Sequence, residues 1–480
     1  MAVAATDTCK PLCVDMDGTL LATDVLWESL LVLLKNQPLK IFSLPLWLFK
    51  GKAYFKRELS RCVRLNPAAL PYRESVLAFL REEKESGREI ILATASDQHV
   101  AQSVADHLGI FSAVHASDGR VNLSGAHKRS TLETQYGRKG FDYIGNSEVD
   151  LPIWQAADQA LLVQPSAGLL KKARQVSSVH RIFSGPPKRS AVFLKALRVT
   201  QWVKNILVFV PLLMAHKIAD PALAQQAVCA FLVFSLCASS VYIVNDLLDL
   251  ESDRQHPRKK NRPFAAGTLE IKTGVLLAPL LLVSSFVISF KFLPLLFTAL
   301  LALYLVLTTA YSFYLKRLLI VDVLILAGLY TLRVLSGGIA VEVFISPWLL
   351  AFSSFFFLNL AVVKRYAELR MIRERKQAHN SARGYIVDDN ELLRSIGPTA
   401  GYLSVLVLML YINSKEVTML YKHPTVLWQI APFLLYWITR IWFMAHRGQM
   451  DDDPIVFAVK DPLSYAVGAA VAVILVLASL

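Results

Sequence analysis

The chain of 480 residues has few charged side chains: Asp, Glu, Lys and Arg make up 18% of it, against about 25% in soluble domains. Hydrophobic residues account for 54%. This composition argues against a wholly soluble enzyme and against a disordered protein. The formal net charge is +14. Because it stands beside long apolar runs, we expect it to face an anionic membrane surface or phosphate ligands rather than nucleic acid.

Cysteine is scarce as well, and a secretory signal is missing. The five cysteines form neither a CxxC pair nor a paired zinc spacing, so the sequence implies no disulfide framework and no structural metal site. The first residues lack a basic stretch followed by an apolar one, the pattern of a secretory signal. We therefore expect the N-terminal part to stay in the cytosol.

Hydrophobicity divides the chain into two parts. Residues 1–165 mix polar helical segments with short strand-like runs. Beyond residue 190, long apolar segments lie near 199–215, 222–248, 274–290, 292–311, 319–340, 346–363, 396–413, 425–445 and 463–480. Each approaches the roughly 20 residues that cross a bilayer. The intervening stretch 164–191 is rich in Ser, Gly, Pro and basic residues, a composition typical of a linker.

We accordingly expect two domains. Residues 1–185 form a soluble domain plus linker, and residues 190–480 form an all-α, multi-pass membrane domain with about nine transmembrane helices. With a cytosolic N-terminus, the inside loops are 249–272, 312–318, 364–395 and 446–462. They carry eighteen Lys and Arg residues, whereas the outside loops carry four. This asymmetry indicates a cytoplasmic, inner-membrane protein with the N-terminal domain in the cytosol.

Two carboxylates stand in the run VDMDGTL, directly after a strand-like lead. Carboxylates two positions apart on a loop can do separate work: Asp15 can attack a phosphorus atom, and Asp17 can protonate the leaving oxygen. Thr94, or Ser96, ends the next strand-like run, at the edge where open α/β sheets bind ligands.

Two further residues suit the same chemistry. Lys128 can neutralise a phosphate and the aspartates, and Asp150 follows a third strand-like run and can bind Mg²⁺. This ordered set resembles the haloacid dehalogenase (HAD) superfamily of phosphatases over about residues 1–165. The resemblance implies a Rossmann-like α/β fold with a helical cap near residues 22–85.

By this resemblance Asp15 is the nucleophile, Asp17 is the acid/base, and Thr94 and Lys128 bind phosphate. Asp15, Asp17 and Asp150 are the implied Mg²⁺ ligands. One departure is that the family often has GDxxxD, whereas Gly145 is followed here by the neutral Asn146. The alternative is a degenerate, regulatory domain. The cap stretch 25–51 is unusually apolar, and it either lies on a membrane surface or packs as an ordinary cap.

The second part holds an acidic segment at a predicted membrane edge. Asn245, Asp249 and Asp253 are four residues apart, so one helix face presents all three oxygen ligands. Asp246 lies beside them. Carboxylates in such register repel one another, and Mg²⁺ removes the repulsion while sharing its coordination with substrate phosphates. The basic residues that follow, Arg262 included, can cradle an anion.

NDxxDxxxD followed by R…RP resembles the UbiA superfamily of intramembrane transferases, over about residues 195–480. Most members transfer a prenyl group from its diphosphate and carry a second Asp-rich motif. Residues 311–340 contain only Asp322, so that motif is missing. LRVTQWVKN, YSFYLK, LRVLSGG and KRYAEL resemble the decaprenyl-phosphate phosphoribosyltransferase branch.

That branch transfers 5-phosphoribose from phosphoribosyl diphosphate (PRPP) to a polyprenyl phosphate lipid. The resemblance implies a Mg²⁺ site at Asn245, Asp246, Asp249 and Asp253, of which Asp249 and Asp253 are also the catalytic candidates. It implies donor or lipid-phosphate contacts at Lys204, Asn205, Arg262, Tyr311, Lys316, Arg333, Lys364 and Arg365. Alternatively, Arg333 pairs with Asp322, and Lys364 and Arg365 anchor a helix end.

The order of the two domains suggests a bifunctional enzyme whose phosphatase removes the 5-phosphate from the transferred ribose. Two other hypotheses remain open. One is a UbiA-type transfer of a polyprenyl group to an aromatic acceptor, with an unrelated or regulatory HAD domain. The other is a membrane scaffold whose HAD module binds a phosphorylated ligand. An oligomer is compatible with the sequence but is not indicated by its residues.

Overall fold

The computed structural model describes residues 10–185, 189–374, 384–450 and 454–480. Their contacts divide the chain into two compact units. The first, the sheet unit, comprises Met1–Leu197 and Tyr242–Ala278. The second, the helical unit, comprises Arg198–Val241 and Pro279–Leu480. The segment that holds the predicted acidic motif therefore belongs to the sheet unit.

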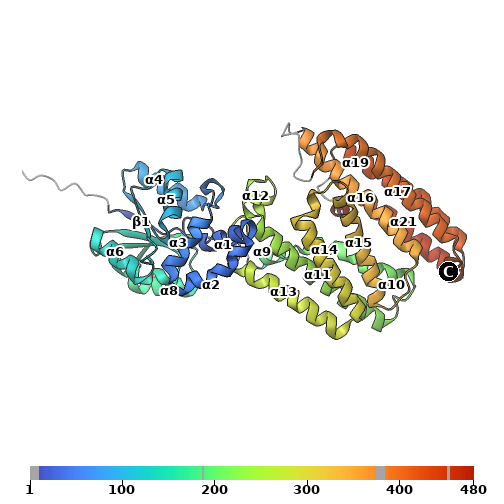
Figure 1. The fold of residues 1–480 in the computed structure, drawn as a ribbon, viewed down its shortest axis with the longest axis horizontal. Helices are drawn as coiled ribbons and strands as arrows, with labels where there is room; N and C mark the ends of the chain where they lie inside the picture. The colour runs from blue at the N-terminus through green and yellow to red at the C-terminus, as the bar shows by residue number, and fades with distance from the viewer. Residues whose placement is uncertain (1–9, 186–188, 375–383, 451–453) are drawn as a thin grey trace, which may run out of the picture. The chain divides into compact units, whose positions relative to one another are not determined.

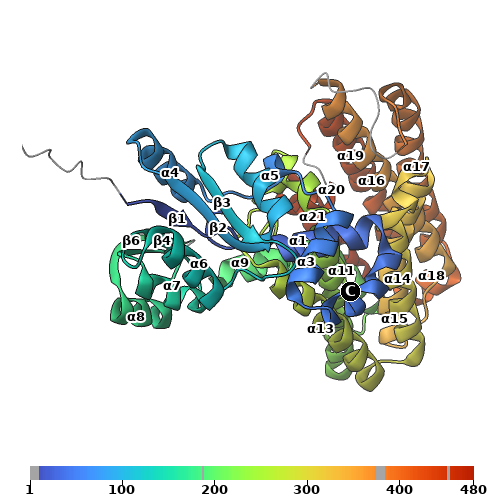
Figure 2. The same ribbon diagram turned by 60° about the vertical axis from the view of Figure 1, so that its left-hand side comes forward.

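The sheet unit is built on six parallel strands in the order β3-β2-β1-β4-β5-β6 (Figure 2). The strands are β1 (Leu12–Val14), β2 (Ile90–Asp97), β3 (Ala113–Ser117), β4 (Asp142–Gly145), β5 (Gln159–Val163) and β6 (Ser178–Phe183). All three residues of β1 are fully buried. Such continuous apolar strands form because helices cover both faces of a parallel sheet. The prediction of an N-terminal α/β domain is confirmed.

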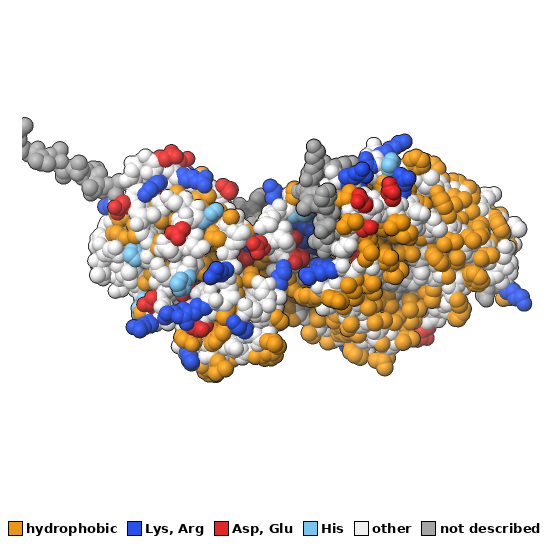
Figure 3. Space-filling model, turned by 45° about the horizontal axis from the view of Figure 1, so that its top comes forward, with side chains coloured by type: hydrophobic (Ala, Val, Ile, Leu, Met, Phe, Trp, Pro, Cys, Tyr) orange, Lys and Arg blue, Asp and Glu red, His pale blue; other side chains and the backbone are white. Residues whose placement is uncertain are grey.

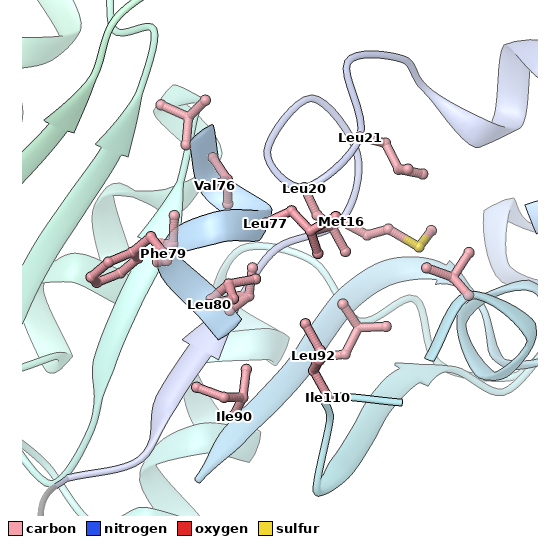
Figure 4. Packing of buried hydrophobic residues seen from close by; sticks show 14 of the residues in the cluster. Met16, Leu20, Leu21, Val76, Leu77, Phe79, Leu80, Ile90, Leu92 and Ile110 are labelled. Carbon is pink, nitrogen blue, oxygen red and sulfur yellow. The ribbon is translucent and has the colours of Figure 1, made fainter. Parts of the chain in front are cut away.

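Two layers of helices cover the sheet. Val76 and Leu80 of α4 (Glu74–Glu85) and Val104 of α5 (Gln98–Leu108) bury one face, together with Leu92 of β2 (Figure 4). On the other face pack α6 (Ala126–Tyr136), α7 (Leu151–Ala156) and α8 (Ala167–Val176). Trp154 of α7 is fully buried there. The sheet thus stands between two apolar layers.

The interpretation of residues 164–191 as a linker is wrong for most of its length. Residues Ala167–Val176 form α8, and Ser178–Phe183 form β6, the last strand of the sheet. Leu169 and Ala173 are buried against the sheet, and Phe183 is buried in the opposite layer. Leu170, Val176 and Val179 pack beside them, so apolar residues at helix and strand spacings order a stretch that is otherwise rich in polar residues. Residues 186–188 lie outside the described part of the chain.

The helical cap is confirmed in part. It consists of α1 (Val25–Asn36), η1 (Pro38–Ser43), α2 (Leu44–Phe49) and α3 (Lys52–Cys62), with η2 (Pro67–Ala69) after it (Figure 1). The last predicted cap residues, 74–85, instead form α4 against the sheet. Asp24 caps α1 by accepting a hydrogen bond from the Leu26 backbone N–H at 2.8 Å. Leu33, Leu59 and Val63 form the small cap core.

The sheet unit also contains the chain segment that connects the long helices α11 (Pro221–Leu248) and α13 (Ile271–Phe292). Helix α11 ends there, followed by α12 (Leu250–Gln255), η5 (Lys259–Asn261) and the first turns of α13. Short helices complete the chain elsewhere: η3 (Glu148–Asp150), α9 (Arg189–Ala196), η4 (Val199–Phe209), α10 (Val210–Met214), η6 (Leu315–Arg317), η7 (Val387–Asp389), α18 (Lys415–Leu420), η8 (Pro424–Gln429) and α20 (Pro454–Lys460).

Within the described residues, eight helices are long and apolar enough to cross a membrane. Besides α11 and α13 they are α14 (Leu295–Phe313), α15 (Val321–Ala340), α16 (Pro347–Glu374), α17 (Asn390–Ile412), α19 (Ile430–His446) and α21 (Pro462–Ser479), with η7 and η8 extending α17 and α19. The multi-pass prediction is confirmed at eight spans, and Figure 3 shows hydrophobic side chains over most of the visible surface of these helices.

The ninth predicted span, 199–215, is not a straight helix. It consists of η4 and α10, and it meets the criteria for a span only as one part of a bent pair with Ser190–Ala196. Arg198 before it has a left-handed φ of 53°, which interrupts a helix. Lys204 and Asn205 are buried inside it, so polar groups occupy positions that a straight lipid-facing helix would give to apolar ones.

We predict that Leu80→Ala destabilises the sheet unit by about 2–5 kcal/mol, because it opens a cavity in a fully packed layer. Hydrogen exchange of the β2 backbone amides in the full chain measures this locally. Val121→Ala serves as the control because Val121 is 48% exposed. An effect of Leu80→Ala no larger than that of the control would contradict this packing.

Candidate functional site

Strands β1 and β4 are neighbours in the middle of the sheet. From β1 the chain continues to β2 and β3 on one side, and from β4 it continues to β5 and β6 on the other, so the strand order reverses between β1 and β4. In open parallel sheets a crevice forms outside the carboxyl ends of the strands at such a point. Asp15 and Asp17 follow β1, and Asn146 and Asp150 follow β4. The structure therefore brings the predicted residues of the first motif to one edge of the sheet.

A chain of hydrogen bonds crosses this edge. The Lys128 ammonium lies 2.7 Å from Asp15 Oδ1 and 3.0 Å from the Tyr143 hydroxyl. Tyr143 in turn donates to Asp150 Oδ1 at 3.0 Å. Burial opposes the charge on Lys128, but Asp15 and Asp150 outweigh it and raise the lysine pKa. Lys128 thus holds the Asp15 carboxylate in place and supplies positive charge for a bound phosphate.

The Asp150 carboxylate is held by hydrogen bonds within the protein. Its Oδ2 accepts hydrogen bonds from the backbone N–H groups of Asn146 and Ser147 and from the Ser147 hydroxyl, at 3.0–3.1 Å. Four donors in total engage this carboxylate, which is 3% exposed. Its evident structural role is to shape the loop after β4 and to orient Tyr143. Direct coordination of Mg²⁺ by Asp150 stays a prediction.

Asp17 has surroundings that suit a proton donor. Its Oδ2 accepts from the Ser96 hydroxyl at 2.5 Å, and its Oδ1 accepts from the Val25 backbone N–H at 2.8 Å. Burial, assisted by the charge of Asp24, raises the pKa of Asp17 to about 7 in spite of these bonds. A carboxyl group with this pKa can give and take a proton near neutral pH.

The two candidates at the end of β2 have different positions. Thr94 is fully buried, and its hydroxyl oxygen accepts the Ser96 backbone N–H at 3.1 Å. Ser96 lines the cavity described below and bonds to Asp17. Ser96, which the sequence offered as the alternative, is therefore the one placed to touch a ligand.

Asn146 lies over the turn after Asp17. A Cβ on Gly18, whose φ is +73°, would lie 2.2 Å from Asn146 Nδ2, so only glycine leaves room for this side chain. Carboxylate and amide oxygens from Asp15 and Asn146 suit Mg²⁺ when a substrate phosphate completes its coordination. Among the described residues no group of three or more His, Cys, Asp and Glu could hold a metal ion by itself. The residues fit a shared metal site, not an all-protein one.

A cavity of about 770 Å³ opens above these residues. Asp15, Asp17 and Lys128 form part of its lining, and Lys56 and Arg73 add two more cationic side chains. Gly267 to Thr273 also line it, and these residues follow the acidic segment, residues 245–253, at the end of α11. Gly267 approaches the backbone closely, since a Cβ there would lie 2.3 Å from the Ala22 carbonyl oxygen. The volume suits a substrate larger than inorganic phosphate.

The acidic segment is arranged differently from the predicted row. Arg262 donates to Asp246 Oδ1 at 3.0 Å and to Asp253 Oδ2 at 2.6 Å, and both aspartates are 2% exposed. Asp249 instead lies 3.3 Å from the ammonium of Lys35. Asp249 stands at the break between α11 and α12. Asp249 therefore pairs with Lys35 and Asp253 pairs with Arg262, and the two do not form the single row of ligands that the spacing predicts.

The cap and the acidic segment are joined by a buried ion pair in the sheet unit. Arg254 donates to the Glu28 carboxylate, and their side chains are 9% and 4% exposed. Thr23 donates to Glu28 at 2.7 Å, and Arg254 also donates to the Ala265 carbonyl oxygen at 3.0 Å. Arg254 is therefore a structural residue here rather than part of an open anion cradle.

In the helical unit, Arg333 is enclosed. It donates to Asn205 Oδ1 at 2.8 Å, to the Leu329 carbonyl oxygen at 2.6 Å and to the Tyr304 hydroxyl at 3.1 Å. It is 4% exposed. Asn205 also donates to the Ser235 hydroxyl at 3.0 Å. These bonds satisfy all three guanidinium nitrogens of Arg333, which favours a role in positioning Asn205 and the neighbouring Lys204.

Arg333 does not pair with Asp322, so that alternative is wrong. Asp322 lies 2.7 Å from Arg365 and accepts from the Tyr385 hydroxyl at 2.5 Å. Arg365 also contacts Glu368 and is fully buried. A buried, doubly paired guanidinium contributes to the fold. Lys316, Lys364 and Tyr311 are partly exposed and remain the predicted phosphate or donor contacts from their region.

Sequence reasoning missed several of these residues. Tyr143 sits in a strand-like run and gives no sign of its link between Lys128 and Asp150. Glu28 and Arg254 are 226 positions apart, a separation at which no spacing rule applies. The sequence gives no sign of the contact made by Tyr385. Its partner Asp322 stands out in the sequence as the one acidic residue of 311–340.

This chain is similar to a known protein family over its second half and to individual proteins over part or nearly all of its length. The family model described as the UbiA prenyltransferase family matches residues 206–460. Uncharacterized protein y4nM of Sinorhizobium fredii is 37% identical over 473 residues, which cover 98% of this chain and 91% of that protein. Decaprenyl-phosphate phosphoribosyltransferase of Mycolicibacterium smegmatis is 39% identical over 195 residues, covering 39% of this chain and 60% of that protein.

Among solved structures, a UbiA homolog from Archaeoglobus fulgidus bound to GPP and Mg²⁺ covers 60% of this chain and 100% of its own, at 14% identity and a TM-score of 0.45. The similarity to y4nM extends over nearly the whole chain. The parallel-sheet domain is thus part of the resemblance, together with the membrane helices.

We predict that Asp17→Asn stabilises the sheet unit at pH 8 by about 1–3 kcal/mol and not near pH 4. The folded pKa of about 7 lies above the ordinary 3.8, so the folded state binds more protons in this window. Stability is therefore lost as pH rises from 4 to 7, and the neutral amide escapes that loss. Pulse proteolysis in urea at several pH values measures the difference.

The control is Asp118→Asn, whose exposed carboxylate has a pKa lowered by backbone hydrogen bonds from Val121 and Arg120. It should show no gain that grows with pH. A constant difference between Asp17→Asn and the wild type at all pH values would refute the assignment.

Proposed function

Because the chain belongs to the UbiA prenyltransferase family, and is a membrane transferase of this type, we propose that it moves 5-phosphoribose from PRPP to a polyprenyl phosphate, with Mg²⁺. The acidic segment at residues 245–253 and the relative that is named for this reaction support the proposal. The absence of a second Asp-rich motif among residues 311–340 disfavours a prenyl diphosphate donor.

In the proposed transfer, Asn245, Asp246, Asp249 and Asp253 would hold Mg²⁺ together with the donor diphosphate. The bound ion would neutralise charge that develops on the leaving group. For this, Arg262 has to release Asp246 and Asp253, after which its guanidinium is free to bind a phosphate. The guanidinium that already balances two buried acids supplies the positive charge that the metal ion would replace.

The lipid phosphate is the nucleophile. One of its oxygens bonds to C1 of the ribose while the bond from C1 to the diphosphate oxygen breaks, and diphosphate leaves. The lipid phosphate is ionised at neutral pH, so the step requires no general base. Lys204, Lys316 and Lys364 are the proposed cations for the phosphates, with Asn205 and Tyr311 as neutral contacts. Positioning of the two substrates carries much of the rate.

We further propose that the sheet unit is a phosphatase for the 5-phosphate of the product. Asp15 attacks the phosphorus atom, the bond from phosphorus to O5 breaks, and Asp17 donates its proton to O5. Water, deprotonated by Asp17, then releases phosphate from Asp15. Lys128 and Ser96 supply charge and hydrogen bonds beside these groups, and a Mg²⁺ shared by Asp15, Asn146 and the phosphate would add to the charge.

One observation supports the pairing of the two activities above all others. The cavity over Asp15 is lined partly by Gly267 to Thr273, the residues that follow the acidic segment. A phosphorylated group released near this segment would have a short way to the phosphatase cavity, and covalent linkage raises its effective concentration. The nearly full-length similarity to y4nM agrees with a joint role for both parts.

The same proposal includes the location. The sheet unit lies in the cytosol, where PRPP would reach it, and the helices cross the inner membrane with their basic loops inside. The partners are PRPP, the polyprenyl phosphate and the surrounding bilayer.

We predict that Asp253→Asn lowers the transfer of radiolabelled 5-phosphoribose from PRPP to polyprenyl phosphate at least about 100-fold, because the metal loses a charged ligand. The full chain in vesicles is assayed by counting label in the lipid extract. Glu251→Gln, an exposed neighbour, serves as the control and should retain activity. Transfer that is unchanged in Asp253→Asn would exclude a metal site at this segment.

The same assay tests the two rival functions. Prenyl transfer from a prenyl diphosphate to hydroxybenzoate, with no label from PRPP, would favour an aromatic prenyltransferase. A chain that performs neither reaction and still binds a phosphorylated ligand would favour a scaffold.

We predict that Asp15→Asn stops dephosphorylation and leaves transfer intact, so that the 5-phosphorylated lipid accumulates where the wild type yields polyprenyl phosphoribose. The cause is the loss of the nucleophile, which an amide cannot replace. Mass spectrometry of the lipid extract distinguishes the products, and Asp118→Asn is the matched control. Identical products from Asp15→Asn and the wild type would show that the two activities do not act in sequence.

A further inference from the structure

The cap contains a segment that the domain does not bury. Of the twelve residues of η1 and α2, Pro38–Phe49, none is buried. Phe49 is 91% exposed, Leu39 is 80% exposed and Phe42 is 78% exposed, and Leu46 and Leu48 are more than half exposed. Single exposed apolar residues are ordinary, but five large ones within eleven positions form a patch of the kind that marks an interaction surface.

The segment is nevertheless attached to the domain in a defined way. Leu44 and Trp47 are partly buried against the cap core around Leu33 and Leu59. Helices α1 and α2 both contact α3 and η1 (Figure 1). The inward side chains therefore fix η1 and α2, and the other apolar side chains point away from the core. A fixed apolar surface does not arise from local disorder and requires something to cover it.

The charge of the region selects the partner. Between Glu28 and Glu58 the sequence has no acidic residue and six basic ones. Lys40, Lys50 and Lys52 are exposed and flank the apolar patch, with Lys50 lying over the Tyr54 ring. An apolar surface bordered by lysines fits a bilayer whose headgroups are anionic, because the side chains enter the lipid while the ammonium groups meet phosphate.

The chain itself brings a bilayer within reach. Its helical unit contains eight apolar helices that can cross a membrane. Pro38 and Pro45 stand in the first turns of η1 and α2 and keep both helices too short to span it. A surface position is what remains for them.

We propose that the segment Pro38–Phe49, with Lys40, Lys50 and Lys52, binds the surface of an anionic bilayer and holds the cap at the level of the lipid headgroups. The assignment does not depend on the reaction proposed above. Its consequence for the sheet unit is that Lys56, which lines the cavity and donates to the Ala95 carbonyl oxygen at 2.6 Å, lies on the helix that directly follows the anchored segment. A lipid-linked substrate could then be reached without leaving the membrane.

The test places a nitroxide label at Phe49 or Phe42. The full chain, with its native cysteines replaced and Phe49→Cys or Phe42→Cys introduced, is reconstituted into vesicles of phosphatidylcholine and phosphatidylglycerol. Collision with oxygen, which partitions into lipid, is compared with collision with a water-soluble nickel complex. We expect the oxygen-to-nickel ratio at both sites to exceed that at the control Val121→Cys at least about threefold. Val121 is 48% exposed and lies in the loop after β3.

Three outcomes would overturn the proposal. High nickel collision at Phe49, as at Val121, would mean that the segment faces water. Low collision with both reagents would mean that protein covers it, and magnetic broadening between labels would identify a second copy as the cover. Equal ratios in vesicles of phosphatidylcholine alone, unaffected by Lys40→Gln, Lys50→Gln and Lys52→Gln together, would exclude anionic lipid as the partner.

Discussion

The compensation of buried charge governs this molecule. Several buried acids are held by cations: Asp15 by Lys128, Glu28 by Arg254, Asp246 and Asp253 by Arg262, and Asp322 by Arg365. Hydroxyl and backbone N–H donors hold Asp17 and Asp150 instead. An unpaired buried charge costs several kcal/mol, and removing one partner of a pair is strongly destabilising. Such pairs contribute less to net stability than to fixing which segments meet.

This pairing of charges explains how the acidic segment, residues 245–253, is attached to the cap. Arg254 reaches Glu28 in the cap, and Lys35 of α1 reaches Asp249. Both contacts lie within the sheet unit. The residues from Tyr242 to Ala278 therefore join the transmembrane helices in sequence and the α/β domain in space. A change in the charge of the acidic segment, as on binding a metal and diphosphate, would act directly on these pairs and on the residues that line the cavity.

The same principle explains the two buried arginines of the helical unit. Arg333 and Arg365 are both predicted phosphate contacts, and Arg333 stands inside a span, where an unpaired charge is costly. Their purpose in this structure is internal: Arg333 satisfies Asn205, Tyr304 and a backbone carbonyl, and Arg365 balances Asp322. A lysine differs from these arginines in chemistry, since its ammonium is a compact charge on a flexible stem.

The sequence by itself determined the N-terminal α/β fold, the strand ends that carry Asp15 and Asp17, and the apolar helices, because these depend on local periodicity, run length and turn residues. It did not reveal that residues 167–183 form a helix and a strand, since a few correctly spaced apolar side chains outweigh a linker-like composition. Only the tertiary structure decided that Ser96 rather than Thr94 lines the cavity, that Asp249 parts from Asp253, and that Arg254 meets Glu28. Those outcomes depend on which distant charges and surfaces come together when the chain packs, and no spacing along the sequence encodes that directly.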